Sequence, residues 1–361
     1  MTKFLKSFPD QTFLSKHPLL DGRFHKILEE SGSVSAKTGW DPHHIEVQDA
    51  LLPGYIKYHS FGEYIFDWQW ANFYEYHGLK YYPKLLHALA YTPVNASKTL
   101  GDASSFKTLA SESFNNYLTK DLSSEHYLFI NETEVKVLKE LGFAIQKTIQ
   151  FHFQNTFESF EDYLGAMTKN RRKNIKKERK RIKDYPIEIK HHQGAEITPA
   201  LMSEFYLFYL STISKKSAYA YLSKEFFIKL SQSLNDKVYI ISAIESGKTI
   251  AMSLFFYGEN ALYGRYWGIS PKYEKKYPLL HFELCYYQGI EFCLKHKIKL
   301  FEAGAQGEQK LMRGFRPTII YSAHHIKIKE CYELIKKAVS EQNELTSKQL
   351  VEYQKYLPFK K

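Results

Sequence analysis

The chain has 361 residues, of which 44% are hydrophobic and 16% aromatic, and its net charge is +11. This length suits two domains, and this hydrophobic content lets both build cores, which excludes a disordered chain. No run approaches the roughly 20 apolar residues of a membrane-spanning helix, and the N-terminus lacks the apolar stretch of a signal peptide. The three cysteines are odd in number and lack metal-ligand spacing. We therefore expect a cytoplasmic protein without a metal site, at most peripheral at the inner membrane face.

The first part of the chain mixes predicted helices and strands. Helical periodicity covers 17–30, 104–118 and 132–141. Strand patterns cover 55–67, 126–130 and 147–153, and a further element at 81–94 ends at Pro93.

Aromatic and acidic side chains cluster in this first part. Tyr64, Asp67 and Trp68 lie at the end of one predicted strand, and Tyr82 and Lys84 open the next element. Dense aromatic side chains among acids are typical either of a core rim or of a cleft for a polar ligand. Both interpretations stay open, and the second makes these five residues candidate substrate contacts.

A long helix over 157–183 is predicted to open the second domain, so we divide the chain into 1–155 and 156–361. Residues 168–183 hold ten Lys or Arg and one Glu, which is nine of the eleven net positive charges. Ile175 and Ile182 form a seam that can pack. The basic face is either solvated or binds an anionic partner, tRNA or a lipid surface. The candidate contacts are Arg171, Arg172, Lys173, Lys176, Lys177, Arg179, Lys180 and Arg181.

The second part begins with helices over 200–213 and 224–234. Three strands at 238–244, 249–257 and 261–269 follow, joined by hairpin turns. A helix over 279–296, strands at 298–303 and 318–329 and a helix over 330–357 complete it.

Three antiparallel strands, a helix and a fourth strand parallel to the third resemble the skeleton of the GNAT acyltransferase fold. The first part of the chain shows a similar order more faintly. We predict an α/β (α+β) protein with two tandem GNAT-like domains, each a mixed, mostly antiparallel sheet flanked by helices.

A GNAT-type sheet splays where its third and fourth meander strands part, and the acyl donor enters there. Arg265, Tyr266 and Trp267 end the third strand at this point. A charged residue in an apolar strand needs a partner, either Glu302 on the next strand or a ligand. These three residues are therefore candidate substrate contacts.

His281 and Glu283 open the central helix, where either side chain is placed to take a proton from an attacking amine. A glutamate there also suits the helix dipole. Glu302 is the third catalytic candidate. Polar side chains that follow the last strand are expected to hold an anionic group of donor or acceptor: Gln306, Glu308, Lys310 and Arg313.

The loop 270–278, SPKYEKKYP, contains no glycine and two prolines. Prolines remove N–H donors, so this loop does not suit the backbone cradle that binds the pyrophosphate of CoA. Its three lysines, Lys272, Lys275 and Lys276, offer an alternative way to hold phosphates.

The stretches SGSVSAKTGWDPHHI, KYHSFGEYIFDWQWA, HGLKYYPKLLHALAYTPV, LYGRYWG, LHFELCYYQGIE and EAGAQGEQKLMRGFRP resemble the FemAB-like peptidoglycan biosynthesis/recognition family of the GNAT superfamily. The resemblance runs from about His17 to Pro358. In that family a histidine commonly stands where this chain has Gln309, so the resemblance assigns that side chain no role.

The resemblance implies transfer of an acyl or aminoacyl group to an amine acceptor. Fem ligases use aminoacyl-tRNA to extend the side chain of a cell-wall peptide precursor. No tightly bound cofactor is implied, and aminoacyl-tRNA or acyl-CoA is the expected donor. Two alternatives remain: a CoA-dependent N-acyltransferase, and a non-catalytic module that recognises a peptide or glycopeptide.

Overall fold

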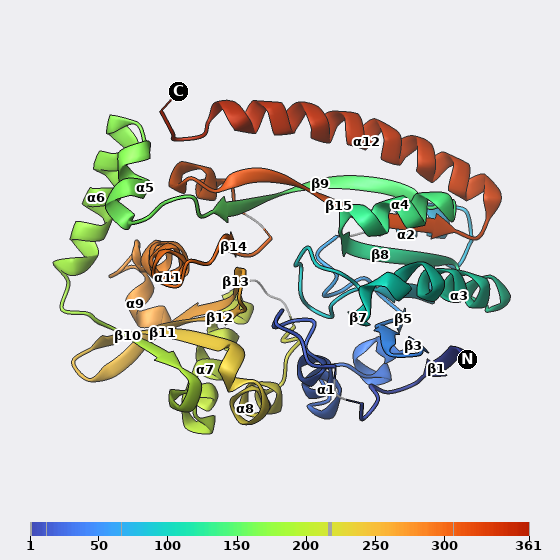
Figure 1. The fold of residues 1–361 in the computed structure, drawn as a ribbon, viewed down its shortest axis with the longest axis horizontal. Coiled ribbons are helices and arrows are strands. Elements are labelled where there is room, and N and C mark those ends of the chain that lie inside the picture. Colours follow the sequence, from blue (N-terminus) through green and yellow to red (C-terminus); the bar gives the residue numbers. More distant parts are fainter. Residues whose placement is uncertain (1, 12, 66, 216–218, 306, 361) are drawn as a thin grey trace. The chain divides into compact units, whose positions relative to one another are not determined.

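A computed structural model describes residues 2–11, 13–65, 67–215, 219–305 and 307–360. The chain forms two compact units, each built from segments that are far apart in the sequence (Figure 1). The first unit contains Met1–Ser15, Leu19–Gln150 and Ile319–Val351, and the second contains Lys16–Pro18, Phe151–Thr318 and Glu352–Lys361. The predicted ranges were 1–155 and 156–361. The main difference is that residues 319–351 belong to the first unit and not to the second.

In the first unit, five strands are neighbours in the order β2, β5, β6, β8 and β15. The β2–β5 and β5–β6 pairs are antiparallel, β6–β8 is parallel, and β8–β15 is antiparallel. Their bounds are Trp40–Pro42, Tyr55–Lys57, Lys84–His87, Ser124–Ile130 and Arg316–Ile326. A separate sheet has the order β1 (Thr2–Leu5), β3 (His44–Val47), β4 (Ala50–Leu52) and β7 (Leu100–Gly101).

Two helices of this unit, α1 and α4, begin at residues whose side chains satisfy their first N–H groups. Asp21 accepts a hydrogen bond from Arg23 N at 3.1 Å, and Asn131 and Glu134 form a reciprocal capping box. The core contains Leu109, Tyr127 and other apolar side chains of the helices and sheets. The helices are α1 (Gly22–Glu30), α2 (Trp68–Tyr76), α3 (Phe106–Thr119), α4 (Glu132–Glu140) and α12 (Lys329–Lys355), with 3-10 turns at Ala36–Thr38 and Ala103–Ser105.

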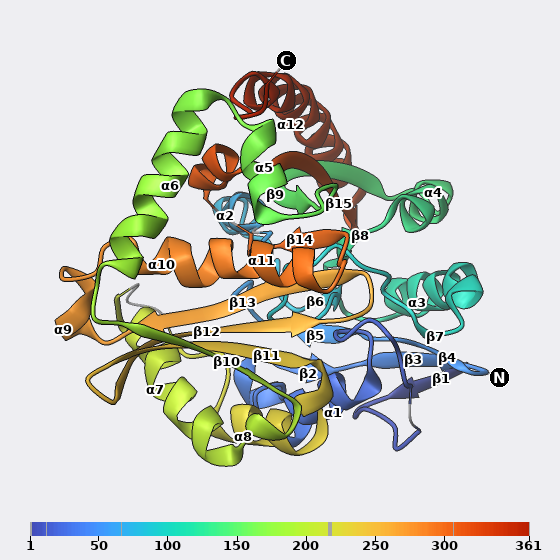
Figure 2. The same ribbon diagram turned by 60° about the vertical axis from the view of Figure 1, so that its left-hand side comes forward.

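The second unit repeats the same succession of strand pairs. The strands β10 to β13 form an antiparallel meander, β13 pairs with β14 in parallel, and β14 pairs with β9 in antiparallel fashion (Figure 2). Their bounds are β9 (Ala144–Gln154), β10 (Glu188–Gln193), β11 (Val238–Glu245), β12 (Lys248–Tyr257), β13 (Ala261–Ile269) and β14 (Leu300–Glu302). This repeat confirms the predicted pair of GNAT-like folds.

A central helix connects β13 to β14. It consists of α10 (Leu280–Phe282), a π-helical turn (Glu283–Tyr287) and α11 (Gln288–Lys295). At Gly289 an added Cβ would lie 2.6 Å from the ring of Phe301, so the helix approaches β14 more closely than a side chain would allow.

Helices cover both faces of this meander. The central helix lies on one face, and α7 and α8 lie on the other (Figures 1 and 2). The remaining helical segments are α5 (Phe160–Ala166), α6 (Lys169–Lys183), α7 (Pro199–Lys215), α8 (Lys224–Ser233) and α9 (Pro271–Glu274), with 3-10 turns at Gly194–Glu196, Asn235–Lys237 and Glu308–Arg313.

Several elements differ from the sequence prediction. The strand predicted over 55–67 ends at Lys57, and the aromatic segment after Asp67 is helical. The helix predicted over 157–183 is two helices, because Met167 is extended and forms a β-bridge with Phe359. None of the helices within the described ranges is both long and apolar enough to cross a membrane.

Candidate functional site

A cavity lies where β13 and β14 part, as the sequence predicted. The two strands pair only from Ala261 to Tyr263 on β13, and the next four residues of β13 line a cavity of about 110 Å³. Arg265, Tyr266 and Trp267 are thus brought together at this gap, with Ala303 and Gly304 opposite them.

A β-bulge shapes this part of β13. Leu254 of β12 pairs with Tyr266 and Phe255 pairs with Gly264, so Arg265 is the extra residue. Bulges bend a strand and redirect a side chain, and they occur often beside active sites. Gly264, beside Arg265, is the sequence signal for the bulge, because glycine inside a strand often marks one.

The central helix forms the other wall through His281, Cys285 and Tyr286. The π-helical turn places these three residues on one side of the helix. The His281 ring packs against Trp267 and Tyr286, with ring centroids 5.3 Å apart in both cases. Burial raises the pKa of the Cys285 thiol, which therefore stays protonated and is not a nucleophile.

Lys310 lies directly behind the wall of the cavity. Its side chain is fully buried, and its Nζ donates to the carbonyl oxygen of Gly304 at 2.5 Å. Burial lowers the pKa of Lys310 to about 7, because the charged amine loses its hydration. The charge of Arg265 lowers the pKa of Lys310 further, and Glu302 opposes this lowering. Near neutral pH the amine is therefore able to accept a proton, a role that the sequence analysis did not assign to it.

Glu302 is buried on β14, opposite Tyr263 in register. Its Oε2 lies 3.9 Å from His152 Nε2. Burial lowers the pKa of His152 to about 3, and the nearby Lys310 lowers it further, so the imidazole is neutral at pH 7. Glu302 is buried and does not line the cavity itself.

Glu283 is not placed as the sequence suggested. Its carboxylate accepts hydrogen bonds from Arg179 Nη2 at 2.8 Å and Gln288 Nε2 at 2.7 Å. Arg179 also bonds Glu291 at 2.7 Å. The carboxylate of Glu283 thus holds α6 to the central helix, and we do not retain it as a base.

The polar residues after β14 also have other partners. The Arg313 guanidinium lies 3.6 Å from the ring centroid of Phe282, and its Nη2 donates to Glu178 at 2.8 Å. Glu308 is exposed and accepts a hydrogen bond from Tyr353. Neither residue lines the cavity. Gln306 lies outside the described residues.

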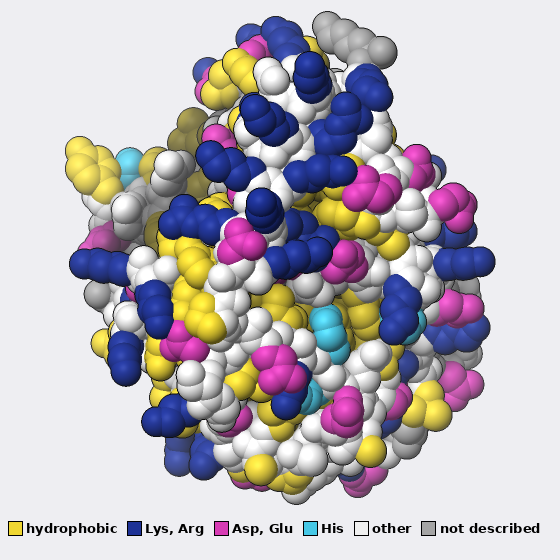
Figure 3. Space-filling view, turned by 90° about the vertical axis from the view of Figure 1, so that its left-hand side faces the viewer, with side chains coloured by type: hydrophobic (Ala, Val, Ile, Leu, Met, Phe, Trp, Pro, Cys, Tyr) yellow, Lys and Arg dark blue, Asp and Glu magenta, His cyan; other side chains and the backbone are white. Residues whose placement is uncertain are grey.

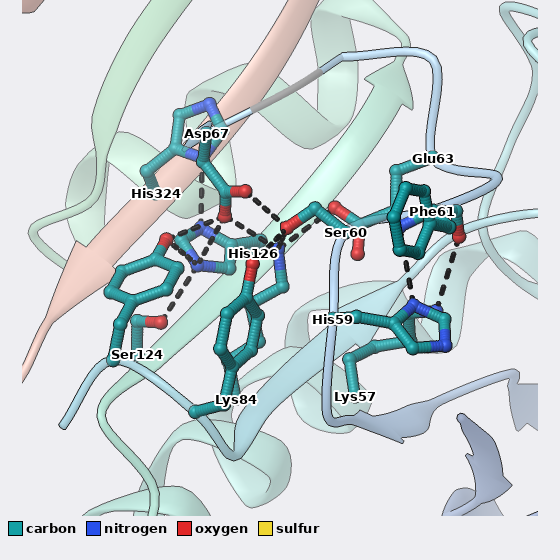
Figure 4. A network of polar contacts seen from close by, with 12 residues as sticks. Lys57, His59, Ser60, Phe61, Glu63, Asp67, Lys84, Ser124, His126 and His324 are labelled. Carbon is teal, nitrogen blue, oxygen red and sulfur yellow. Dashed lines mark hydrogen bonds and ion pairs between the residues drawn. The ribbon is translucent and has the colours of Figure 1, made fainter. Parts of the chain in front are cut away.

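Two of the five candidates from the first unit, Asp67 and Lys84, belong to a buried polar network (Figure 4), and Tyr82 joins it through Ser60. Lys84 Nζ donates to Asp67 Oδ2 at 2.5 Å, Glu63 Oε2 at 2.8 Å and Ser60 Oγ at 2.9 Å. Burial alone would raise the pKa of Asp67, but the charge of Lys84 holds it below its ordinary value. The opposite charges of Asp67 and Lys84 therefore neutralise each other in the interior, and neither side chain is directed at a ligand.

Glu63 belongs to the same network, but its pKa is shifted in the opposite direction from that of Asp67. Burial raises its pKa to about 7, and Lys84 opposes this rise. Tyr82 is half-buried and shares a hydrogen bond of 2.8 Å with Ser60 Oγ, whereas Trp68 is half-exposed at the start of α2. Tyr64 has a φ of 64° and is also half-buried.

The α6 helix turns one seam inward and its basic side chains outward. Ile175 and Ile182 are buried, and Arg179 is largely buried by its two ion pairs. The exposed basic residues are Lys169, Lys173, Lys176, Lys177, Lys180, Arg181 and Lys183, and Arg171 and Arg172 are half-buried. Figure 3 shows Lys and Arg side chains gathered over this helix.

The strand order and the cavity at the β13–β14 gap define a GNAT-type fold. The chain belongs to the FemAB-like family, described as peptidoglycan biosynthesis/recognition, whose profile matches residues 5–361. Family membership connects the chain with the synthesis or recognition of peptidoglycan. None of the curated proteins matches the sequence.

Solved structures with low sequence identity share the fold. L-PGS from Bacillus licheniformis has 12% identity and a TM-score of 0.55, over 89% of this chain and 96% of that chain. The C-terminal domain of a putative lysylphosphatidylglycerol synthetase from Agrobacterium fabrum has 10% identity and a TM-score of 0.56, over 90% and 97%. FemX has 10% identity and a TM-score of 0.51, over 85% and 93%.

Proposed function

We propose that the second unit transfers an acyl or aminoacyl group from an activated donor to an amine acceptor such as a cell-wall peptide precursor. The cavity at the β13–β14 gap carries this proposal, because a strand edge and His281 line it together, and the buried amine of Lys310 is hydrogen-bonded to Gly304 of its wall. The reacting carbonyl of the donor lies against β13 beyond Tyr263, where β13 has no register partner on β14. Backbone N–H groups at such an edge stabilise the negative charge that develops on the carbonyl oxygen.

The acceptor amine must lose a proton before or during its attack. Its nitrogen bonds to the carbonyl carbon, the bond from that carbon to the leaving oxygen or sulfur breaks, and the proton passes through a base to the leaving group. Lys310 fits the base, since its pKa is about 7 and Gly304, to which it bonds, lines the cavity. His281 is the second candidate, because its ring lines the cavity itself.

An aminoacyl-tRNA suits this unit better than CoA as the donor. The loop before the central helix contains α9 and two prolines, and Lys276 bonds Glu245 at 2.6 Å. The amine of Lys276, one of the three lysines of this loop, is therefore already engaged. The exposed basic side chains of α6 belong to the same unit and suit a polyanion. The similar structures named FemX and lysylphosphatidylglycerol synthetase support an aminoacyl donor.

Transfer is tested with tRNA that carries a radiolabelled amino acid and with peptides that present a free side-chain amine. We expect label on the peptide, and we expect His281→Ala and Lys310→Met each to lower kcat/KM by about 100-fold, the scale of general-base catalysis. Glu308→Gln is the matched control, because Glu308 is exposed and does not line the cavity. Unchanged turnover in both cavity variants refutes the assignment, and faster transfer from acyl-CoA favours the CoA-dependent alternative.

The partner of α6 is tested by replacing Lys173, Lys177, Lys180 and Arg181 together with Gln. Binding to a polyanion weakens as salt concentration rises, so a plot of the logarithm of the binding constant against the logarithm of salt concentration slopes downward. Each lost phosphate contact makes this slope less steep by about 0.7 to 0.9. The control removes the same charge from exposed positions on α12, at Lys329, Lys336, Lys337 and Lys348. Weaker binding to tRNA in the first variant alone supports tRNA, whereas loss of binding to anionic vesicles alone assigns the helix to a lipid surface.

A further inference from the structure

The first unit contains a groove that the transfer reaction does not use. It has a volume of about 640 Å³, which is within the range of sites for small ligands. The first turn of α2, the β9 residues from Gln146 to Ile149 and one face of α12 enclose it. Figure 1 shows α12 running along β9 and β15.

The lining of the groove is polar but nearly free of charge. Of its fourteen residues, only Lys147 and Glu341 are charged, and their charges are opposite. The chain as a whole has 25% charged residues, so neither an anion nor a cation is selected here. The polar side chains are amides and hydroxyls that both donate and accept hydrogen bonds: Gln69, Gln146, Thr148, Gln342, Thr346 and Gln349.

Two tryptophans add flat apolar surface to this neutral lining. The Trp68 side chain is 48% exposed, and Leu345 across the groove is 58% exposed. The ring of Trp70 packs edge-on against the ring of His324, with 4.8 Å between the ring centroids, and this contact fixes its position. His324 in turn shares a hydrogen bond of 2.9 Å with His126. The buried network of Figure 4 therefore fixes the start of α2 and the indoles that it presents.

The floor of the groove does not accept an additional strand. Asn343 of α12 accepts from Lys147 N at 2.7 Å and donates to the carbonyl oxygen of Ile145 at 2.7 Å. Thr346 donates to the carbonyl oxygen of Lys147 at 3.3 Å. These side chains occupy the backbone groups of β9 that an extended peptide would need for pairing.

We propose that this groove binds an uncharged carbohydrate, with a sugar ring stacked on Trp68 and its hydroxyl groups bonded to the glutamine amides. A sugar ring combines a flat C–H face with hydroxyls that donate and accept, which matches an indole among neutral amides. A peptide is the disfavoured occupant, because the β9 edge is already bonded. This inference does not depend on the transfer reaction, whose candidate residues belong to the second unit.

The test is a calorimetric titration of the full chain with two uncharged oligosaccharides, chitotetraose and cellotetraose, and with a neutral tetrapeptide. We expect saturable binding of at least one oligosaccharide. Trp68→Ala should weaken that binding at least tenfold, and Ala338→Trp, which fills the groove from α12, should abolish it. Thermal melting of each variant identifies loss of fold, and either variant alone suffices for the test.

The matched control is Tyr76→Ala, which removes an 86% exposed aromatic from the other end of the same helix. It should bind as the unmodified chain does. His281→Ala should also bind normally, so a failure of the transfer proposal is distinguishable from a failure of this one. The proposal is overturned if neither oligosaccharide binds, if folded Trp68→Ala and Ala338→Trp both bind normally, or if the tetrapeptide binds more tightly.

Discussion

The buried amine of Lys310 predicts a variant that gains stability while it loses activity. The pKa of Lys310 falls from 10.5 to about 7 on folding, because the side chain is fully buried. Between these two values the unfolded chain binds more protons than the folded chain, so stability rises with pH. Below pH 7 both states are protonated, and the penalty of burying the charge is complete.

The magnitude follows from this shift. One pKa unit corresponds to about 1.4 kcal/mol, so the full penalty at acidic pH is about 5 kcal/mol. Between pH 7 and pH 9 about 2 kcal/mol of it is relieved. Lys310→Met carries no such penalty, although it loses the hydrogen bond to Gly304, which is worth about 1 kcal/mol.

Urea unfolding of both proteins at several pH values measures this effect. The free energy of unfolding of the unmodified chain should rise relative to that of Lys310→Met by about 2 kcal/mol from pH 7 to pH 9. Transfer activity of the unmodified chain should rise over pH 6 to 8 as the amine loses its proton. A stability difference that is independent of pH would contradict the assignment of a neutral buried amine.

Three further predictions concern other buried groups. Arg179→Met leaves Glu283 without its counter-charge and should lower the free energy of unfolding by about 3 kcal/mol in urea titrations. If the variant keeps its full stability but loses turnover, Glu283 is a catalytic residue after all. Lys84→Met leaves the buried carboxyl groups of Glu63 and Asp67 without their counter-charge and should lower the free energy of unfolding by about 3 to 5 kcal/mol in urea titrations. The exposed Lys80→Met is the control and should leave it unchanged. Equal stabilities of the two variants would show that the network is solvated. Cys285 should react with a maleimide in the folded chain far more slowly than in urea, because its thiol stays protonated, and rapid labelling of the folded chain would disprove this.

The order of elements in the second unit was predictable from the sequence because its signals are local. Hairpin turns separate β11, β12 and β13, and each strand has the length and apolar content of a buried strand. The gap after Tyr263 follows from that order, since a GNAT-like sheet opens where its parallel strand begins. Arg265, Tyr266, Trp267 and His281, which the sequence proposed for the site, line this cavity together, and their roles stay a prediction.

The aromatic segment around α2 shows where local signals fail. Trp and Tyr are frequent in strands, so the residues up to Asp67 suggested a continuous strand. The carboxylate of Asp67 does not cap α2 but bonds Lys84 and Ser60, which lie elsewhere in the chain. These contacts join segments that are distant in the sequence, so no local pattern reveals them.

The sequence alone determined the repeated fold and the strand end at which the cavity opens, because turn residues and apolar patterns act over short distances, and its motifs resemble the family to which the chain belongs. Only the tertiary structure decided what each charged side chain does. Glu283 and Lys310 are both polar residues near the predicted site, yet Arg179 neutralises the first, and burial lowers the pKa of the second to about 7. Charge and protonation depend on which groups surround a side chain in space, and neighbours such as Arg179 are more than a hundred residues away along the chain.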